Sequence, residues 1–205
     1  MNTGLSFIHH FEQGTSSQVP LLLLHGTGGN EQDLISLGKA LAPSRSLLSP
    51  RGKILENGMP RFFRRLAEGV FDEEDVRNRA HELADFILSA QAVYGLAKPV
   101  AVGFSNGANI AAALLLLRPE ILSGAILLRA MVPLSEPPRA ALAQTPILLI
   151  SGASDPIIPL SNATRLATML KNAGASVQHE TLPTGHNLTQ QDMKIATQWL
   201  NKQEK

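Results

Sequence analysis

The chain has 205 residues, of which 44% are hydrophobic and 17% are charged, a composition typical of a globular protein rather than a disordered one. Its 18 basic and 17 acidic residues give a net charge of +1, which indicates no electrostatic preference for nucleic acid or an acidic membrane. The absence of cysteine excludes disulfides, thiolate metal sites and a cysteine nucleophile.

The length favours a single domain over residues 1–205, and it leaves the oligomeric state open, a homodimer included. The longest purely apolar run, residues 110–117, is far shorter than the roughly 18 residues of a membrane span. The first basic residue is Lys39, so the N-terminus lacks the basic region of a signal peptide. We therefore expect a cytoplasmic protein with neither a membrane nor a nucleic-acid partner.

Continuous apolar runs bounded by turn residues predict six strands. Such runs are typical of strands that are covered on both faces, as in a parallel sheet. The predicted strands are residues 19–25, 46–49, 99–104, 124–128, 147–151 and 177–182, with 6–11 as a further strand at one edge.

Segments of helical periodicity separate these strands. Asn30, Asp72, Ser161 and Thr189 each stand where a capping side chain would open a helix, and Gly174 would end the third of these helices. Strands joined by helices of this length predict right-handed crossovers. The expected fold is therefore α/β, a mostly parallel, doubly wound sheet with helices on both faces.

Two connections, residues 50–71 and 133–145, are longer than usual, and long connections in compact domains are usually functional or mobile. The first carries five cationic side chains beside Met59, Phe62 and Phe63. The charges alone are typical of a solvated rim, whereas the phenylalanine pair needs a partner surface or a ligand.

Gly103-Phe104-Ser105-Asn106-Gly107 has the pattern Gly-x-Ser-x-Gly and lies between a predicted strand and a helical run. In this context the motif predicts a nucleophilic serine on a sharp, strained turn. The glycines let neighbouring backbone approach, and the helix N-terminus offers free N–H groups. The alternative is a glycine-rich turn whose serine is incidental, and the strand–turn–helix context argues against it.

A serine hydroxyl needs a base to remove its proton, and the chain has six histidines. His186 stands in a loop after the last predicted strand, at the edge where parallel sheets place their ligands. His179 lies within that strand and is the weaker candidate. His9 and His10 precede the core strands, and His81 is expected on the exposed face of a helix.

A carboxylate should fix the tautomer of the base. Asp155 follows the apolar run 147–150, at the carboxyl end of another predicted strand. The other aspartates suit helix caps (Asp33, Asp72, Asp75, Asp192) or a helix surface (Asp85). The chain order of serine, aspartate and histidine is the α/β-hydrolase order and differs from the orders of the two serine protease types.

Acyl transfer also needs N–H donors for the developing oxyanion. The residue after the nucleophile, Asn106, is predicted to supply one of them. Thr27, in the turn His25-Gly26-Thr27-Gly28-Gly29, is predicted to supply the other. Alone this turn is a weak signal, because any glycine-rich strand-to-helix turn would look the same.

Together these segments resemble the phospholipase/carboxylesterase family of α/β-hydrolases, which includes the acyl-protein thioesterases. Within the family the chain is most similar to bacterial serine esterases of the hydroquinone-pathway type. Dienelactone hydrolases are also similar, but they carry Cys where this chain has Ser105. The resemblance extends over nearly the whole chain, in residues 22–34, 49–52, 103–109, 152–159 and 185–186.

The resemblance implies an α/β-hydrolase fold without a separate lid domain, and it implies neither a cofactor nor a metal. It implies a catalytic triad of Ser105, Asp155 and His186. It also implies an oxyanion hole formed by Thr27 and Asn106. Asn106 departs from the Gln that family members often carry there, which leaves the backbone donor in place but puts any side-chain role in doubt.

The resulting interpretation is a serine carboxylesterase that hydrolyses short to medium carboxylic esters, with a small-molecule ester as its partner. The resemblance implies that residues 50–71 line the acyl pocket in place of a lid. The candidate walls are apolar side chains beside the catalytic loops, each of which fits a place in the core equally well: Met59, Phe62, Phe63, Met131, Val132, Ile157 and Ile158.

Two other functions remain open on the sequence. A thioesterase or lysophospholipase would use the same triad, because the triad treats oxygen and sulfur esters alike. A non-catalytic binding protein on the same fold would be expected to lack a triad residue, and all three residues are present.

Overall fold

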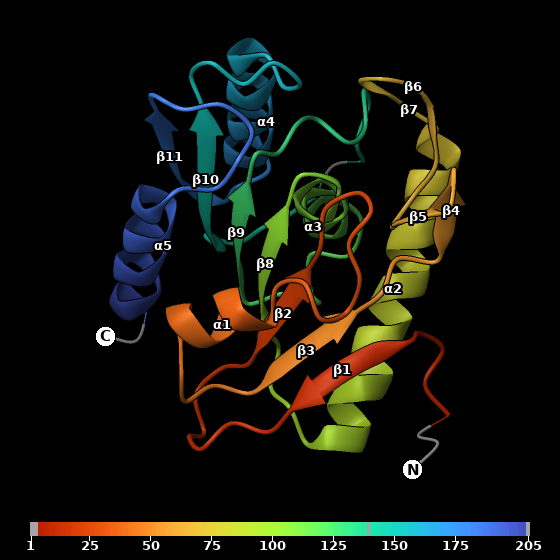
Figure 1. Ribbon diagram of the computed structural model, residues 1–205, viewed down its shortest axis with the longest axis vertical. Helices are drawn as coiled ribbons and strands as arrows, with labels where there is room; N and C mark the ends of the chain where they lie inside the picture. Colours follow the sequence, from red (N-terminus) through yellow and green to blue (C-terminus); the bar gives the residue numbers. More distant parts are fainter. Residues whose placement is uncertain (1–3, 139, 204–205) are drawn as a thin grey trace.

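Seven strands form one sheet in the computed structural model, which describes residues 4–138 and 140–203 (Figure 1). Six of them run parallel, and the first strand of the chain pairs antiparallel at one edge. From that edge the order is β1 (His9–Glu12), β3 (Leu47–Pro50), β2 (Leu21–Leu24), β8 (Val100–Phe104), β9 (Gly124–Leu128), β10 (Pro146–Gly152) and β11 (Ser176–Leu182).

All six predicted parallel strands are present, so the expected mostly parallel α/β sheet is confirmed. The edge strand begins at His9 rather than at residue 6. The reason is that Phe7 turns into the core, where it is 5% exposed and its ring lies 4.9 Å from that of Phe86. Residues 6–8 therefore lie outside the strand, although the carbonyl of Ile8 still accepts a backbone N–H beside β3, that of Arg51 at 2.8 Å.

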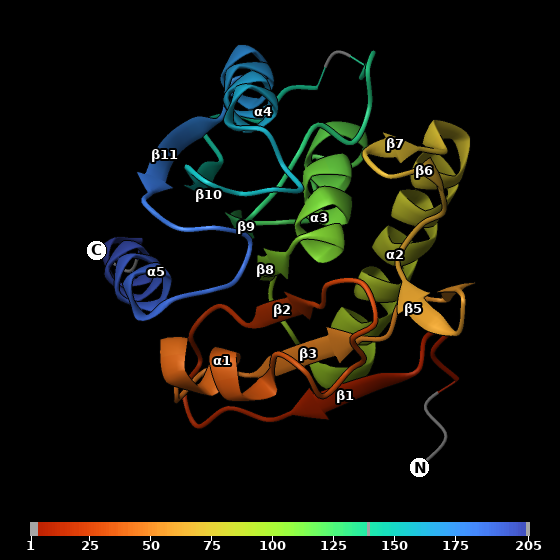
Figure 2. The same ribbon diagram turned by 45° about the horizontal axis from the view of Figure 1, so that its top comes forward.

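Helices cover both faces of this sheet (Figure 2). On one face lie α1 (Ile35–Leu41) and α5 (Gln190–Lys202), and on the other α2 (Glu73–Tyr94), α3 (Asn106–Leu117) and α4 (Leu160–Asn172). Leu21 and Leu23 pack with α1 and α5, whereas Leu22 and Leu24 pack with α2 and α3, as alternation along a strand requires. Among the described residues, no helix is both long and apolar enough to cross a membrane.

Two of the predicted helix starts are confirmed. The carboxylate of Asp72 accepts the N–H of Asp75 at the start of α2. Thr189 and Asp192 form a reciprocal capping box at the start of α5. At the other end of α4, Gly174 adopts the positive φ of +94° that stops the helix.

The other two predicted starts are wrong. The Asn30 side chain accepts the N–H of Gln32 in a local turn, which leaves α1 to begin five residues later, at Ile35. Helix α4 begins at Leu160, one residue before Ser161, and Pro159 occupies its capping position. Proline is tolerated there because its missing N–H would have had no partner in the helix.

Residues 50–71 form two short hairpins instead of an irregular loop. The first pairs β4 (Ile54–Glu56) with β5 (Met59–Arg61), and the second pairs β6 (Arg65–Ala67) with β7 (Val70–Phe71). Asn57 and Gly58 turn the first hairpin with φ angles of +51° and +78°, both in the left-handed region. An Asn-Gly pair favours this kind of two-residue hairpin turn.

The parallel strands end at a single edge of the sheet, because they all run in one direction. Ser105 follows β8 there, and the segments after β2, β10 and β11 meet at the same edge (Figure 1). No lid domain stands over this edge in the described residues, although the two hairpins border it (Figure 2). The candidate site lies here.

Candidate active site

Ser105 occupies the sharp turn between β8 and α3 with φ 52° and ψ −114°, a strained conformation for a residue with a side chain. Its N–H donates to the carbonyl of Leu128 at 2.9 Å, which ties the turn to the neighbouring strand. A Cβ at Gly107 would collide with the carbonyl of Leu24, and one at Gly103 with the carbonyl of Gly107. Both glycines are therefore needed to fold the turn this tightly.

His186 reaches Ser105 from the loop between β11 and α5. Its Nε2 lies 3.0 Å from the serine Oγ, and its Nδ1 lies 2.8 Å from Oδ2 of Asp155. The imidazole side chain is 17% exposed and the carboxylate only 1% exposed. Three side chains that are far apart in sequence thus form a continuous hydrogen-bonded chain.

Asp155 is held in place by its own turn. The N–H groups of Ile157 and Ile158 donate to its Oδ1 at 2.8 and 3.0 Å, leaving Oδ2 for the histidine. Burial opposes ionisation, but the hydrogen bonds from His186 and from these two N–H groups outweigh it and lower the pKa of Asp155. The carboxylate is therefore ionised at neutral pH and can orient an imidazole N–H.

Thr27 and Asn106 both line a cavity next to Ser105 and His186. Asn106 is the first residue of α3, where a backbone N–H has no acceptor within the helix. Its side-chain Oδ1 accepts the N–H of Phe62 at 2.7 Å, and Thr27 Oγ1 accepts from Arg61 Nη1 at 2.8 Å. The segment around β5 is thus hydrogen-bonded to both candidate oxyanion-hole residues.

The cavity has a volume of about 250 Å³. Met131, Ile157 and Ile158 are among the apolar residues that line it. The hairpin segment also lines it, through other residues than expected: Arg61, Arg65, Glu68, Gly69 and Phe71. A volume of this size is below the ~300–1,000 Å³ of pockets that hold drug-sized ligands, so it suits a small molecule.

Comparison with known proteins identifies the relatives of this chain. The sequence profile of the phospholipase/carboxylesterase family matches residues 11–204. The chain belongs to the phospholipase/carboxylesterase family. Its hydrolase character and its α/β-hydrolase fold follow from that membership and from the structural relatives below.

Three relatives are similar over nearly their whole length. The protein MhqD of Bacillus subtilis (strain 168) is 47% identical over 193 residues, which cover 93% of this chain and 96% of that protein. A Bacillus cereus carboxylesterase has 44% identity and a TM-score of 0.95, covering 98% of this chain and 96% of that one. A carboxylesterase from Mesorhizobium loti has 33% identity and a TM-score of 0.92, covering 96% of this chain and 95% of that one.

Four predicted pocket walls do not line the cavity of this family member. Phe62 and Phe63 are 2% and 0% exposed and belong to the hydrophobic core. Phe62 packs on the ring of His25, and Phe63 on that of Phe71, each at 4.8 Å between centroids. Met59 is 41% exposed, and Val132 lines a separate small cavity. The phenylalanine pair therefore has a partner surface, and that surface is the core.

The histidines other than His186 have contacts away from Ser105. His179 is bonded to Ser151 Oγ at 2.9 Å, and burial lowers its pKa. The buried His25 links its turn to the hairpin segment: its Nδ1 lies 2.7 Å from the carbonyl of Gly26, and its Nε2 accepts the N–H of Gly52 at 3.0 Å. Neither His179 nor His25 lines the cavity. The remaining histidines, His9, His10 and His81, do not line it either.

Arg129, at the end of β9, is a site residue that the sequence did not reveal. The guanidinium is fully buried and donates to the carbonyls of Gly185 and Asn187, the two neighbours of His186, at 3.0 and 3.1 Å. Two further bonds, of 2.7 and 3.0 Å, reach both oxygens of Asp192 in the α5 capping box. The loop that carries the histidine is thus fixed from both sides.

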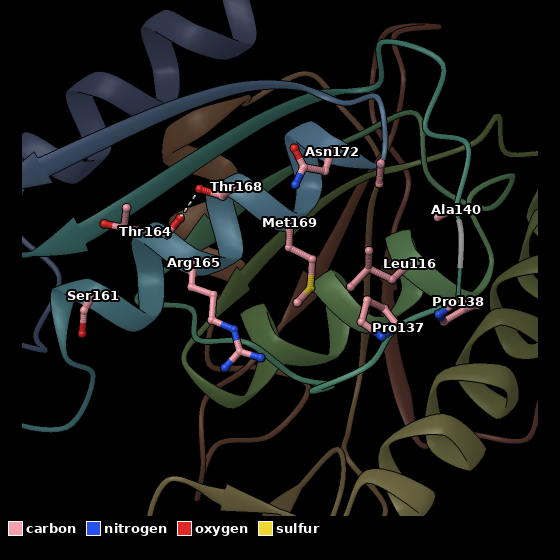
Figure 3. Close-up of a pocket in the computed structure, with 11 residues that line it drawn as sticks. Leu116, Pro137, Pro138, Ala140, Ser161, Thr164, Arg165, Thr168, Met169 and Asn172 are labelled. Carbon is pink, nitrogen blue, oxygen red and sulfur yellow. Dashed lines mark hydrogen bonds between the residues drawn. The ribbon is translucent and has the colours of Figure 1, made fainter.

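A larger cavity, of about 890 Å³, lies elsewhere in the molecule (Figure 3). It is bounded by α4, the end of α3 and Pro137, Pro138 and Ala140, and Met169 of α4 points toward Leu116 of α3. Its threonine hydroxyls donate to carbonyls of their own helix. Its described lining contains neither a histidine nor a carboxylate, so size alone does not make it a catalytic site.

Metal ligands are not grouped in the part of the chain that the structure describes, where no three His, Asp or Glu side chains come together. The site itself offers a serine, a histidine, an aspartate and the N–H groups beside them.

Proposed function

We propose that this member of the phospholipase/carboxylesterase family is a serine carboxylesterase with Ser105 as nucleophile, His186 as base and Asp155 as the group that orients the base. The observation that carries the proposal is the hydrogen-bonded chain from Ser105 Oγ to Asp155 through His186, with both distances at or below 3.0 Å. Nucleophile, base and orienting carboxylate within hydrogen-bond reach are the signature of an activated serine.

The reaction has two halves. In the first, Ser105 Oγ attacks the ester carbonyl while its proton passes to Nε2 of His186, and the backbone N–H groups of Thr27 and Asn106 stabilise the oxyanion. The tetrahedral intermediate collapses when His186 returns that proton to the leaving alkoxide, which departs as the alcohol. In the second half, water loses a proton to His186 and attacks the acyl-enzyme, and Ser105 regains the proton as the carboxylic acid leaves.

The cavity supports a preference for short to medium acyl groups. Each buried CH₂ would add about 0.8 kcal/mol to binding if space allowed, but 250 Å³ fills quickly, so we expect an optimum within roughly C2 to C8. A thioesterase or lysophospholipase for long acyl chains would need a deeper apolar channel.

The test is a series of p-nitrophenyl esters from C2 to C16, measured with the wild type and with Ser105→Ala. We expect kcat/KM to peak at C8 or below and Ser105→Ala to lose turnover by a factor on the order of 10⁶. Retention of even a tenth of the turnover by Ser105→Ala would refute the nucleophile. A kcat/KM that rises through C16 would refute the small-ester preference and favour a lysophospholipase or acyl thioesterase.

A further inference from the structure

Arg61 is a buried cation on the wall of the catalytic cavity. It ends β5, is 3% exposed and lines the same cavity as Ser105 and His186. Its Nε donates to the carbonyl of Phe63 at 3.2 Å, and its Nη1 donates to Thr27 Oγ1 at 2.8 Å. The guanidinium is therefore beside one of the two residues proposed to hold the oxyanion.

Three of the five N–H groups of Arg61 have no acceptor in the part of the chain that the structure describes. A guanidinium has one donor on Nε and two on each Nη, and only the two bonds above are formed. No Arg61 atom is among the described side-chain atoms that are both sealed from solvent and unpartnered. Nη2 is therefore reached by solvent, and the cavity is the space that Arg61 lines.

The cavity lining includes two cationic side chains, Arg61 and Arg65, and one carboxylate, that of Glu68. Arg61 and Arg65 both line the cavity and share a single carboxylate behind it, that of Glu56. Glu56 Oε2 lies 3.2 Å from Arg61 Nε, and Glu56 Oε1 accepts from Arg65 Nε at 2.7 Å. Glu68 lines the cavity itself, but it is exposed, so solvent screens its charge more than that of the buried Arg61.

The catalytic geometry indicates which part of an ester would face this wall. The leaving alcohol must lie on the His186 side, because His186 gives it a proton. The loop of His186 and the hairpins β4–β7 lie on opposite sides of β8 and α3 (Figures 1 and 2). The acyl group, which points away from the leaving group, is therefore directed toward Arg61.

We propose that the preferred substrates are esters whose acyl part carries a carboxylate, that is, half-esters of small dicarboxylic acids, and that Arg61 binds this carboxylate. The open N–H groups match a carboxylate, and charge-assisted hydrogen bonds of this kind are stronger than neutral ones. The inference rests on the proposed ester hydrolysis at Ser105, and it adds the chemical class of the acyl group.

The direct test compares two esters of nearly the same shape on the wild-type enzyme. Monoethyl succinate carries a carboxylate where ethyl levulinate carries a neutral methyl ketone, and both release a proton on hydrolysis at pH 8 that a pH-stat records. We expect kcat/KM to be at least about tenfold higher for monoethyl succinate, and this ratio to fall in 0.5 M NaCl. A ratio of one or below would overturn the inference.

Variants separate carboxylate binding from a merely structural role. Arg61→Met should bring the succinate-to-levulinate ratio to about one, whereas Arg61→Lys should keep part of the preference. Arg118→Met is the control, since Arg118 is also an arginine in ion pairs but lies at the far end of α3 from Ser105. It should leave the ratio unchanged.

Each outcome decides the question. If Arg61→Met lowers kcat/KM equally for both esters, Arg61 only braces Thr27 and the inference is wrong. If Arg61→Met does not fold, the wild-type ratio and its salt dependence decide alone. If wild type hydrolyses neither ester nor any p-nitrophenyl ester, it is the proposed function that fails; cleavage of both without preference overturns only the carboxylate specificity.

Discussion

Two buried arginines on opposite sides of Ser105 differ in how completely they are hydrogen-bonded. Arg129 has an acceptor for each of its five N–H groups, because the carbonyl of Ile150 adds a fifth bond, of 3.3 Å, to those around the histidine loop. Arg61 has acceptors for two. Arg129 also forms an ion pair with a carboxylate of its own, that of Asp192, whereas Arg61 shares the carboxylate of Glu56 with Arg65.

The difference in hydrogen bonding indicates that the two arginines have different roles in the site. A fully satisfied network in a low-dielectric interior specifies a single arrangement, so the histidine side is expected to set the catalytic geometry. A guanidinium with open donors can still accept an anion, so the hairpin side is expected to decide which ester is accepted. Variants on the two sides should therefore change different measured quantities.

The largest expected effect is on the histidine side. His186→Ala should lower kcat by a factor on the order of 10⁵ to 10⁶, since triad members act as a unit. His179→Ala is the control, because that ring bonds Ser151 and does not reach Ser105. It should leave kcat nearly unchanged. Steady-state kinetics check both variants. A larger loss of kcat in His179→Ala than in His186→Ala would show that the base is His179, in β11.

Arg129→Met should cause the second-largest loss of kcat. Loosening the loop of His186 is expected to lower kcat about 100-fold with little change in KM, because misplacement of a catalytic group by about 1 Å has that effect. The variant also leaves Asp192 buried without its partner, which costs about 3–5 kcal/mol of stability. In Arg129→Met/Asp192→Asn the stability should partly return while kcat stays low. Full recovery of kcat would show that Arg129 only supports folding.

On the hairpin side, Phe63→Ala should change stability rather than specificity. Removing a fully buried ring costs about 3–5 kcal/mol, and the optimum acyl length should stay where it is, since Phe63 does not line the cavity. Met131→Ala enlarges the cavity and should shift the optimum to longer esters. Denaturant unfolding and the ester series measure the two effects, and a shifted optimum in Phe63→Ala would contradict the placement.

A smaller effect concerns pH and the buried pair of Arg129 and Asp192. Burial favours the neutral acid, but the bonds from Arg129 and Thr189 outweigh it and lower the pKa of Asp192. A lowered folded-state pKa gives stability that is present above the unfolded pKa of about 3.9 and is lost as pH falls through the folded value. Asp192→Asn should therefore lower Tm by several degrees, about 2–4 °C per kcal/mol, at pH 7. Below about pH 4 the difference in Tm from wild type should shrink, and a gap that is constant from pH 7 to pH 3 would contradict this.

Much of the site was predictable because its signals are local. The serine turn needs glycines at fixed positions, the aspartate follows the apolar run of β10, and the histidine lies in a Pro- and Gly-containing loop after the last predicted strand. Parallel strands bring such run ends to one edge, so the order along the chain was enough to place Ser105, Asp155 and His186 together.

The remainder depends on contacts between distant segments. No pattern near Arg129 reveals that its guanidinium reaches residues 56 to 63 positions further along the chain. Whether Phe62 and Phe63 face a ligand or the core is decided by the packing of their rings into the core cluster that also contains side chains of α2 and α3. Asn57-Gly58 is different, because that hairpin signal is present in the sequence, although residues 50–71 are interpreted from the sequence only as a long connection.

The most direct test of the account is to identify the serine that a fluorophosphonate probe modifies. Only an activated serine reacts, and the described structure holds a second serine bonded to a histidine, Ser151 with His179. Mass spectrometry of wild type should show one adduct, on the peptide that contains Ser105, with none in Ser105→Ala and much slower labelling in His186→Ala. An adduct on Ser151, or labelling that persists in Ser105→Ala, would contradict the assignment of the nucleophile.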